Sequence, residues 1–190
     1  LIPFMMTYAH KYESLSHIPT VLTIHNAQYQ GEFSFNKLYY FPEYNLSYSG
    51  MLEWDQMINP LAAAIKCCWA LTTVSPSYLI ELRSAAKGLE WLLDNEKGKS
   101  TGILNGIDSD VWNPVTDPMI TKNFNKRTAS SGKQNNKQFL CKKFNLDPKK
   151  PLFAFIGRLV GEKGAEILPD IFDRILKETT LEANILVLGS

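Results

Sequence analysis

Apolar positions along the chain follow two alternating periods, that of short buried strands and that of helices. Short β-branched and apolar runs predict strands at residues 20–26, 70–74, 102–106, 152–156 and 185–188. Apolar spacings of three and four residues predict helices at residues 55–69, 76–83, 132–146 and 165–177. Strands that alternate with helices favour parallel βαβ units. We therefore predict an α/β fold with Rossmann-like parallel sheets.

The connections between these elements carry local signals. Ser75-Pro76 is the pair of Ser at N-cap and Pro at N1 that begins many helices. Residues 87–99 are predicted to form a loop. The polar and aromatic segment AQYQGEFSFN follows the first strand, so it lies at a carboxyl end, where open α/β sheets bind their ligands.

A change of composition predicts a domain junction. Residues 113–150 are rich in prolines, charges and polar residues, so we place one domain at residues 1–114 and a linker with a second domain at residues 115–190. The second domain holds a single βαβ unit, which leaves sheet edges and much of the sheet face uncovered. The chain also starts at Leu1 rather than Met. We expect it to be an excerpt in which both domains are incomplete.

Composition and charge narrow the class of protein. The chain is 45% hydrophobic and 21% charged, with 20 Lys+Arg against 19 Asp+Glu, so broad binding to nucleic acid or to a membrane surface is not expected. Cys67, Cys68 and Cys141 show no metal-ligand spacing, and we read the adjacent pair as helix-packing residues in a reduced, cytoplasmic protein. No signal peptide is expected at the start, and no apolar run approaches the roughly 20 residues of a membrane span.

The glycine-rich turn GRLVGEKG at residues 157–164 is the strongest chemical signal. It joins a buried strand to a helix, where unpaired N–H groups and the helix dipole attract anions. Gly157 lets the backbone approach a ligand, while Arg158 and Lys163 offer cations for a diphosphate. The spacing matches neither common nucleotide fingerprint, so a solvated surface turn is an equal alternative on this segment alone.

Other candidate residues also have structural alternatives. His25 ends the first strand, where a ligand role competes with that of a core histidine. Asn105-Gly106 is a favourable turn dipeptide in its own right. Asp108 and Asp110 resemble a divalent-metal pair, but they lie in a turn-rich stretch, and we expect no metal ion and no cofactor. Trp54 and Trp112 are predicted to be packing anchors rather than sugar platforms.

Four segments together resemble the bacterial glycogen synthases and plant starch synthases, whose two-Rossmann-domain architecture is called GT-B. They occur in the family's order over nearly the whole chain: TIHNAQYQGEF (23–33), TTVSPSY (72–78), GILNGIDSDVWNP (102–114) and GRLVGEKG (157–164). The segments MLEWDQMINPLAAAIKCCWA and KGLEWLL are also similar to parts of the family.

The resemblance implies a retaining glucosyltransferase with ADP-glucose as donor, UDP-glucose as the alternative, and an α-1,4-glucan as acceptor. It implies that Arg158 and Lys163 contact the donor's phosphates and that His25 and Asn105 lie by the transferred glucose. Tyr29 and Gln30 are assigned only to lining the cleft or the acceptor path. The family's KxGGL loop and its pair of glutamates have no counterpart in these residues, so we expect the excerpt to be inactive alone.

Two rival functions remain open on the sequence. One is another GT-B enzyme, such as a sucrose-type synthase or a sugar-nucleotide epimerase, which TIHNAQYQG and LNGID disfavour. The other is a non-catalytic protein that keeps the fold and binds a nucleotide or a glucan.

Overall fold

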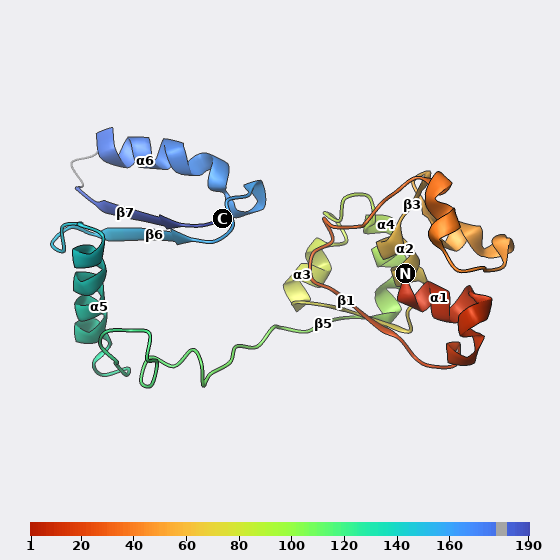
Figure 1. The fold of residues 1–190 in the computed structure, drawn as a ribbon, viewed down its shortest axis with the longest axis horizontal. Helices are drawn as coiled ribbons and strands as arrows, with labels where there is room; N and C mark the ends of the chain where they lie inside the picture. The colour runs from red at the N-terminus through yellow and green to blue at the C-terminus, as the bar shows by residue number, and fades with distance from the viewer. Residues whose placement is uncertain (178–181) are drawn as a thin grey trace. The chain divides into compact units, whose positions relative to one another are not determined.

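Two parallel sheets, one in each half of the chain, form the framework of the fold (Figure 1). The computed structural model describes residues 1–177 and 182–190. The chain divides into two compact units, Leu1–Gly106 and Ile107–Ser190. Each contains parallel strands connected through helices, so the predicted α/β class is confirmed.

The sheet of the first unit has three strands in the order β1-β4-β5, all parallel. Their bounds are Val21–Ile24 for β1, Ala70–Thr73 for β4 and Ser100–Gly102 for β5. The register aligns the last residues of all three strands in one row, so their carboxyl ends form a common edge. Across the sheet the hydroxyl groups of Thr23 and Thr72 lie 2.8 Å apart in a hydrogen bond.

Short helices and turns surround this sheet. They are α1 (Ile2–Tyr8), η1 (His10–Leu15), η2 (Phe35–Tyr40), η3 (Leu46–Met51), α2 (Pro60–Cys67), α3 (Pro76–Glu81), α4 (Glu90–Asn95) and η4 (Glu96–Lys99). A two-stranded hairpin, β2 (Glu53–Trp54) with β3 (Met57–Ile58), precedes α2.

Helix α2 separates two apolar clusters. Ala62 and Ile65 pack into one cluster with Ile24, Leu71 and residues of the α3–α4 region, while Ala63 packs into a second with Phe4 of α1. A helix that is buried on most of its surface needs apolar residues all round, and three consecutive alanines let neighbours approach closely. Cys68 belongs to the first cluster and Cys67 packs against the second, which confirms the packing role predicted for this pair.

The helix predicted at residues 55–69 is wrong at its start. Asp55 and Gln56 both have positive φ, 49° and 62°, and form the two-residue turn between β2 and β3. Consecutive positive φ values suit the type I′ turn of a tight hairpin. The helix begins only at Pro60, where the side chain of Asn59 accepts a hydrogen bond from the N–H of Ala62 at 2.9 Å.

The loop predicted at residues 87–99 is also wrong, since it contains α4 and η4. The side-chain carboxylate of Glu90 accepts hydrogen bonds from the N–H groups of Ala86 and Gly88, at 2.7 and 3.3 Å. The backbone N–H groups of Glu90 itself, of Ala86 and of Gly88 hold the pKa of the Glu90 carboxyl below its usual range. These hydrogen bonds fix the turn that leads into the helix, whose Leu92 and Leu93 enter the core. Six residues are too few for a clear helical period.

The strand predicted at 102–106 begins two residues earlier and ends at Gly102. A Cβ atom on Gly102 would lie 2.4 Å from the Cα of Pro76, so this strand ends directly against the start of α3. Ser75 caps α3 by accepting a hydrogen bond from the N–H of Tyr78 at 2.9 Å, as the Ser-Pro signal predicts.

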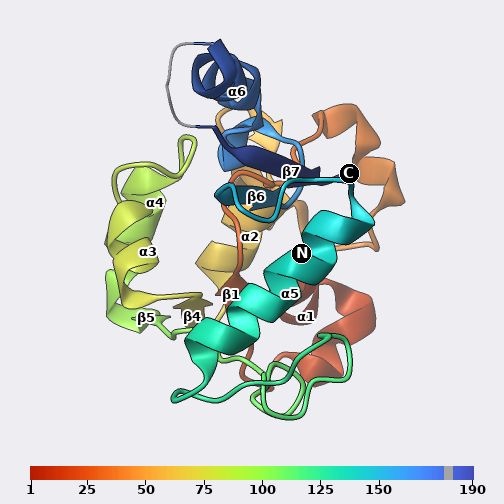
Figure 2. The ribbon, with the colours of Figure 1, turned by 90° about the vertical axis from the view of Figure 1, so that its left-hand side faces the viewer.

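The second unit is built on two parallel strands, β6 (Leu152–Ile156) and β7 (Asn184–Leu188), paired along their whole length. Helix α5 (Ala129–Lys143) precedes them, close to the helix predicted at 132–146. Figure 2 shows α6 (Leu168–Lys177) beside the strands, with α5 on their other side. This βαβ unit is the one predicted from the sequence.

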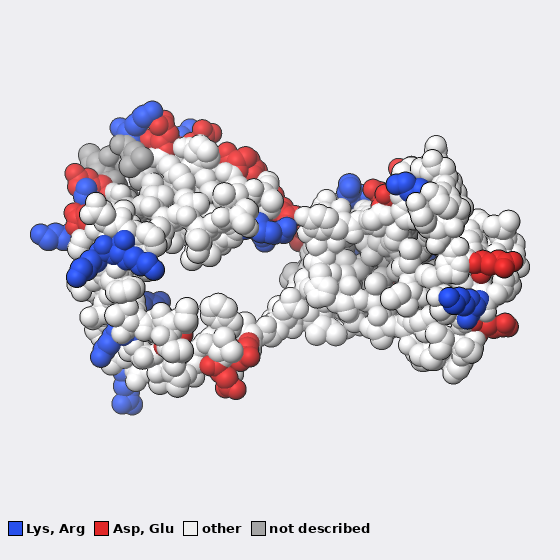
Figure 3. Space-filling view, viewed as in Figure 1, with Lys and Arg blue, Asp and Glu red and all other residues white. Residues whose placement is uncertain are grey.

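In the second unit the helices carry charged side chains, and the strands carry exposed apolar ones (Figure 3). Figure 3 shows Lys and Arg side chains over α5, whereas both signs are interspersed along α6. On the strands of this unit, Ile156 of β6 is 74% exposed and Leu188 of β7 is 64% exposed. None of the helices in the described residues has the length and hydropathy that crossing a membrane requires.

Candidate active site

The carboxyl edge of the first sheet carries His25 and Asn105. His25 directly follows β1, and Asn105 lies three residues after the end of β5. Strand β4 separates these two strands, so their ends are about 10 Å apart, twice the spacing of neighbouring strands. Both residues are exposed. The fold therefore brings them to one edge, with their polar groups open to solvent.

A hydrogen bond to α3 anchors the segment that follows β1. The N–H of Ala27 donates to the hydroxyl of Tyr78 at 3.1 Å, and the side chain of Asn26 accepts from the N–H of Gln28 at 2.9 Å. Ala27 is fully buried. These contacts fix the backbone on both sides of His25, because a strand precedes it and a tethered turn follows it.

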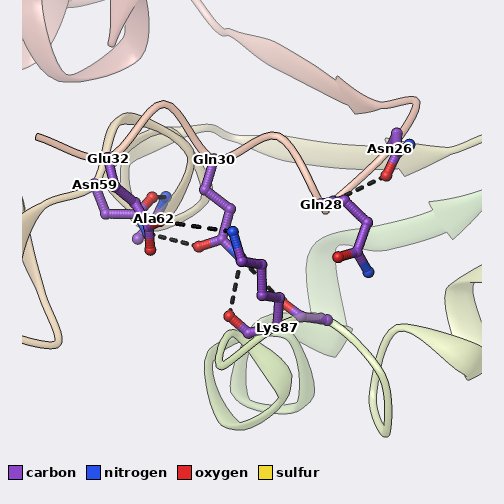
Figure 4. A network of polar contacts seen from close by, with 8 residues as sticks. Asn26, Gln28, Gln30, Glu32, Asn59, Ala62 and Lys87 are labelled. Carbon is purple, nitrogen blue, oxygen red and sulfur yellow. Dashed lines mark hydrogen bonds and ion pairs between the residues drawn. The ribbon is translucent and has the colours of Figure 1, made fainter. Parts of the chain in front are cut away.

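Tyr29 and Gln30 have opposite environments. Tyr29 is 65% exposed, which is compatible with contact to a ligand. Gln30 is 3% exposed, and its amide nitrogen donates to the carbonyl groups of Ala86 and Lys87 at 3.1 and 3.0 Å. Its amide oxygen accepts from the side chain of Asn59 at 2.7 Å (Figure 4). The Gln30 side chain is thus committed to hydrogen bonds inside the protein.

The glycine-rich turn of the second unit begins at the carboxyl end of β6. The N–H of Gly157 donates to the carbonyl of Leu188 at 3.0 Å, and the N–H of Leu159 donates to that of Ser190 at 3.1 Å. A Cβ atom on Gly189 would lie 2.6 Å from the carbonyl oxygen of Gly157. Two backbone segments therefore meet so closely at this end of the sheet that a side chain on Gly189 would collide.

Arg158 and Lys163 are both exposed on this turn. The guanidinium of Arg158 forms an ion pair with the carboxylate of Glu162, four residues later. Lys163 ends the short 3-10 turn η5 (Gly161–Lys163), which closes with Gly164 at φ +71°. This left-handed conformation favours glycine. The turn thus presents two cations and one anion within six residues.

The helix predicted at 165–177 starts three residues late. Residues Ala165–Ile167 form the 3-10 turn η6, and α6 begins at Leu168. Pro169 has no N–H to donate to the carbonyl of Ala165, so a regular α-helical ladder cannot include that bond. The helix N-terminus therefore lies farther from Lys163 than the sequence predicts.

The predicted site residues fall into two groups. His25, Asn105, Tyr29 and Gln30 belong to the first unit, and Gly157, Arg158 and Lys163 belong to the second. No group of three or more His, Cys, Asp or Glu that would hold a metal ion occurs in the part of the chain that the structure describes. Burial raises the pKa of the Cys67 thiol to about 11, which makes it a poor nucleophile near neutral pH.

Two residues have roles that sequence reasoning missed, and one predicted packing role is wrong. Glu162 pairs with Arg158, and its only signal was an opposite charge four residues away. Asn59 caps α2, as an Asn before a Pro at a helix start indicates. Trp112 is 73% exposed and is not a packing anchor within this chain, whereas Trp54 does pack against the first core as predicted.

Comparison with known proteins supports these assignments of fold. The starch synthase catalytic domain family matches residues 1–95. A glycogen synthase of Flavobacterium johnsoniae is 54% identical over 190 residues, and one of Streptococcus sanguinis is 35% identical over 197. Each match covers the whole chain, and the chain spans 40% of the length of these curated relatives.

A solved structure of a starch synthase is also similar to this chain. The catalytic domain of starch synthase IV from Arabidopsis thaliana, bound to ADP and acarbose, superimposes with a TM-score of 0.81 at 32% sequence identity. The match covers 99% of this chain and 39% of that one. The chain therefore belongs to the glycogen and starch synthase family of glycosyltransferases.

Proposed function

We propose that the whole protein transfers glucose from ADP-glucose to the non-reducing end of an α-1,4-glucan, with retention of the anomeric configuration, in the cytoplasm. Residues 1–114 supply the end of the acceptor-side domain, and residues 115–190 supply a linker and the first βαβ of the nucleotide-side domain. The observation that carries the proposal is the turn after β6, with its two exposed cations, in a chain of this family.

Arg158 and Lys163 act on the leaving group. Negative charge grows on the diphosphate as its bond to the sugar breaks, and cations already in place stabilise that charge. Arg158 binds two phosphate oxygens through its planar fork, and Lys163 adds a mobile point charge. Gly157 allows the backbone to approach the same phosphates. The related starch synthase bound to ADP supports a nucleotide diphosphate as the ligand.

His25 and Asn105 position the glucose. They lie at the carboxyl edge of the first sheet, the edge at which open α/β sheets bind ligands. Their side chains orient the sugar by hydrogen bonds while positive charge develops at its anomeric carbon. Tyr29 lines the acceptor path. The leaving phosphate then assists removal of the proton from the acceptor hydroxyl, on the same face of the sugar.

The test uses the full-length protein with labelled ADP-glucose and glycogen. The parent should incorporate label into glycogen, and proton NMR of the product should show new α-1,4 linkages. Arg158→Ala and Lys163→Ala should each lower kcat by about 100-fold or more, as expected for groups that stabilise a transition state. Lys177→Ala is a matched control, since Lys177 is exposed and pairs with Asp173 on α6.

Several results would contradict the proposal. A parent that interconverts nucleotide sugars without lengthening glycogen would be an epimerase. A parent without turnover would be a non-catalytic binder. Faster transfer from UDP-glucose than from ADP-glucose would overturn the proposed donor, and unchanged kcat in both cation variants would remove the diphosphate role from the turn.

A further inference from the structure

A cavity in the first unit lies between the β2–β3 hairpin, α2 and the turn before α4. Its volume is about 420 Å³, within the range of about 300–1,000 Å³ that is usual for small-ligand pockets. The residues that line it are Glu32, Glu53, Trp54, Asp55, Lys66, Lys87 and Gly88. None of them takes part in the transfer reaction proposed above.

Two tryptophans form the aromatic part of this site. The indole N–H of Trp54 donates to the carbonyl of Gly88 at 2.9 Å, which fixes the ring at the cavity wall. The ring of Trp91 stacks on Trp54, with centroids 6.1 Å apart and planes inclined by 26°. Trp91 is 69% exposed. A flat aromatic surface beside the cavity is thus open to solvent, although tryptophan is mostly buried on average.

Carboxylates outnumber ammonium groups in the polar part of the site. Three carboxylates and two ammonium groups line the cavity. Lys66 is engaged by the protein, since it donates to the carbonyls of Gly50 and Glu53, at 3.1 and 2.8 Å, and lies 5.2 Å from the Trp54 ring centroid. The ammonium nitrogen of Lys87 lies 3.9 Å from a carboxylate oxygen of Glu32. A site with more carboxylates than ammonium groups disfavours a phosphate and suits a neutral ligand that donates hydrogen bonds.

A sugar has that combination of surfaces. The C–H face of a glucose ring is apolar and packs on an indole, while its hydroxyl groups donate to carboxylates. The backbone around the carboxylates is fixed, since Glu53 accepts a hydrogen bond from the N–H of Gln56 at 2.8 Å and Asp55 lies in the hairpin turn. Ordered acceptors beside an exposed ring reduce the entropy lost on binding.

We propose that Trp91, Trp54 and this cavity form a second glucan-binding site, which holds glucose units of the polymer independently of the transfer reaction. The choice of an α-1,4-glucan as occupant rests on the proposed function. Such a site would keep a long acceptor attached to the protein between transfers, because two linked contacts raise the effective concentration of the chain end.

The test measures binding separately from catalysis in the full-length protein. Retardation in native gels that contain glycogen gives the affinity for polymer, and transfer to maltotriose at saturating ADP-glucose reports the reaction. Trp91→Ala should weaken glycogen binding by about tenfold, the scale of one lost aromatic contact, and leave kcat with maltotriose unchanged. Trp91→Phe should restore most of the binding.

Two further variants sharpen the result. Trp69→Ala is the matched control, because Trp69 is 62% exposed in the same unit but neither lines the cavity nor takes the place of Trp91 in the ring contact with Trp54. It should bind glycogen like the parent. Asp55→Asn removes one carboxylate and keeps a residue that tolerates positive φ, so it should weaken binding by about threefold without unfolding the hairpin.

The inference is overturned if Trp91→Ala binds glycogen as the parent does, or if Trp69→Ala weakens binding equally. These outcomes are separate from those of the proposed function. A parent that binds glycogen through Trp91 but transfers no glucose would refute the enzyme and keep the site. If the parent transfers glucose and the Trp91→Ala variant is retarded by glycogen as strongly as the parent, the enzyme is kept and the site is refuted.

Discussion

Gln30 shows how one buried side chain can connect three segments of the first unit. Its amide joins the segment after β1 to the cap of α2, through Asn59, and to the turn before α4, through two carbonyl groups. Asn59 in turn caps α2 with its own oxygen. A buried polar group is stable only when its partners are present, so these residues depend on one another.

Gln30→Ala should therefore destabilise the protein rather than act on the substrate. It leaves the Asn59 amide and the carbonyls of Ala86 and Lys87 without their partner, at a loss of about 2–4 kcal/mol in the free energy of unfolding. Urea denaturation of the full-length protein measures this loss. Gln28→Ala, at an exposed neighbour, should change it by less than about 0.5 kcal/mol. A raised KM with unchanged stability would instead support the acceptor-path role predicted for Gln30.

The close contact between β5 and α3 constrains how this strand and this helix pack against each other. Gly102 ends β5, and the backbone of Ser75 and Pro76 occupies the space where its side chain would stand. The same strand end leads to Asn105, and the same helix holds Ala27 through Tyr78. Packing at Gly102 thus sets the positions of both chain segments at the proposed glucose site.

Gly102→Ala should disturb this edge of the sheet. The new methyl would lie 2.4 Å from backbone atoms, which cannot rotate away, so the strand end or α3 must shift, at a cost of about 1–3 kcal/mol. The loss should appear as a lower Tm, together with a lower kcat. Gly98→Ala is the matched control, since a Cβ there meets nothing within 4 Å. Equal Tm values for the two variants would contradict the close approach at Gly102.

The two units differ in how much they bury. Both apolar clusters lie in the first unit. Among the described residues of the second unit, the buried ones are Gly132, Cys141 and Asn184. Two-stranded sheets are marginally stable unless other elements cover them. Stability should therefore be uneven across the molecule.

Hydrogen exchange should reveal this difference in the chain of residues 1–190 produced on its own. Amides of β4 and α2 should exchange at least about 100-fold more slowly than those of β6 and β7, because local opening depends on the apolar contacts that cover a segment. Mass spectrometry of peptic peptides gives the rates for each segment. Equal protection in the two sheets would show that the second unit is as stable as the first.

Features that depend on neighbouring residues or on a simple apolar period could be predicted from the sequence. The α/β class, strand β6, the Ser75 cap and the packing role of the adjacent cysteines were all predicted correctly. Each depends on local backbone preference or on an alternation of apolar residues. The order of the quoted segments also indicated the family, which the comparisons confirm.

Features that join residues far apart in the sequence could not be predicted and are seen in the folded chain. Gln30 contacts Ala86 across 56 positions, and no local signal distinguishes a buried glutamine from an exposed one. The Asp55–Gln56 turn replaced part of a predicted helix because a pairing partner was available for its hairpin. The end of β5 was set by the approach of Pro76. Such choices depend on which atoms meet in space, and periodicity along the chain carries no information about that.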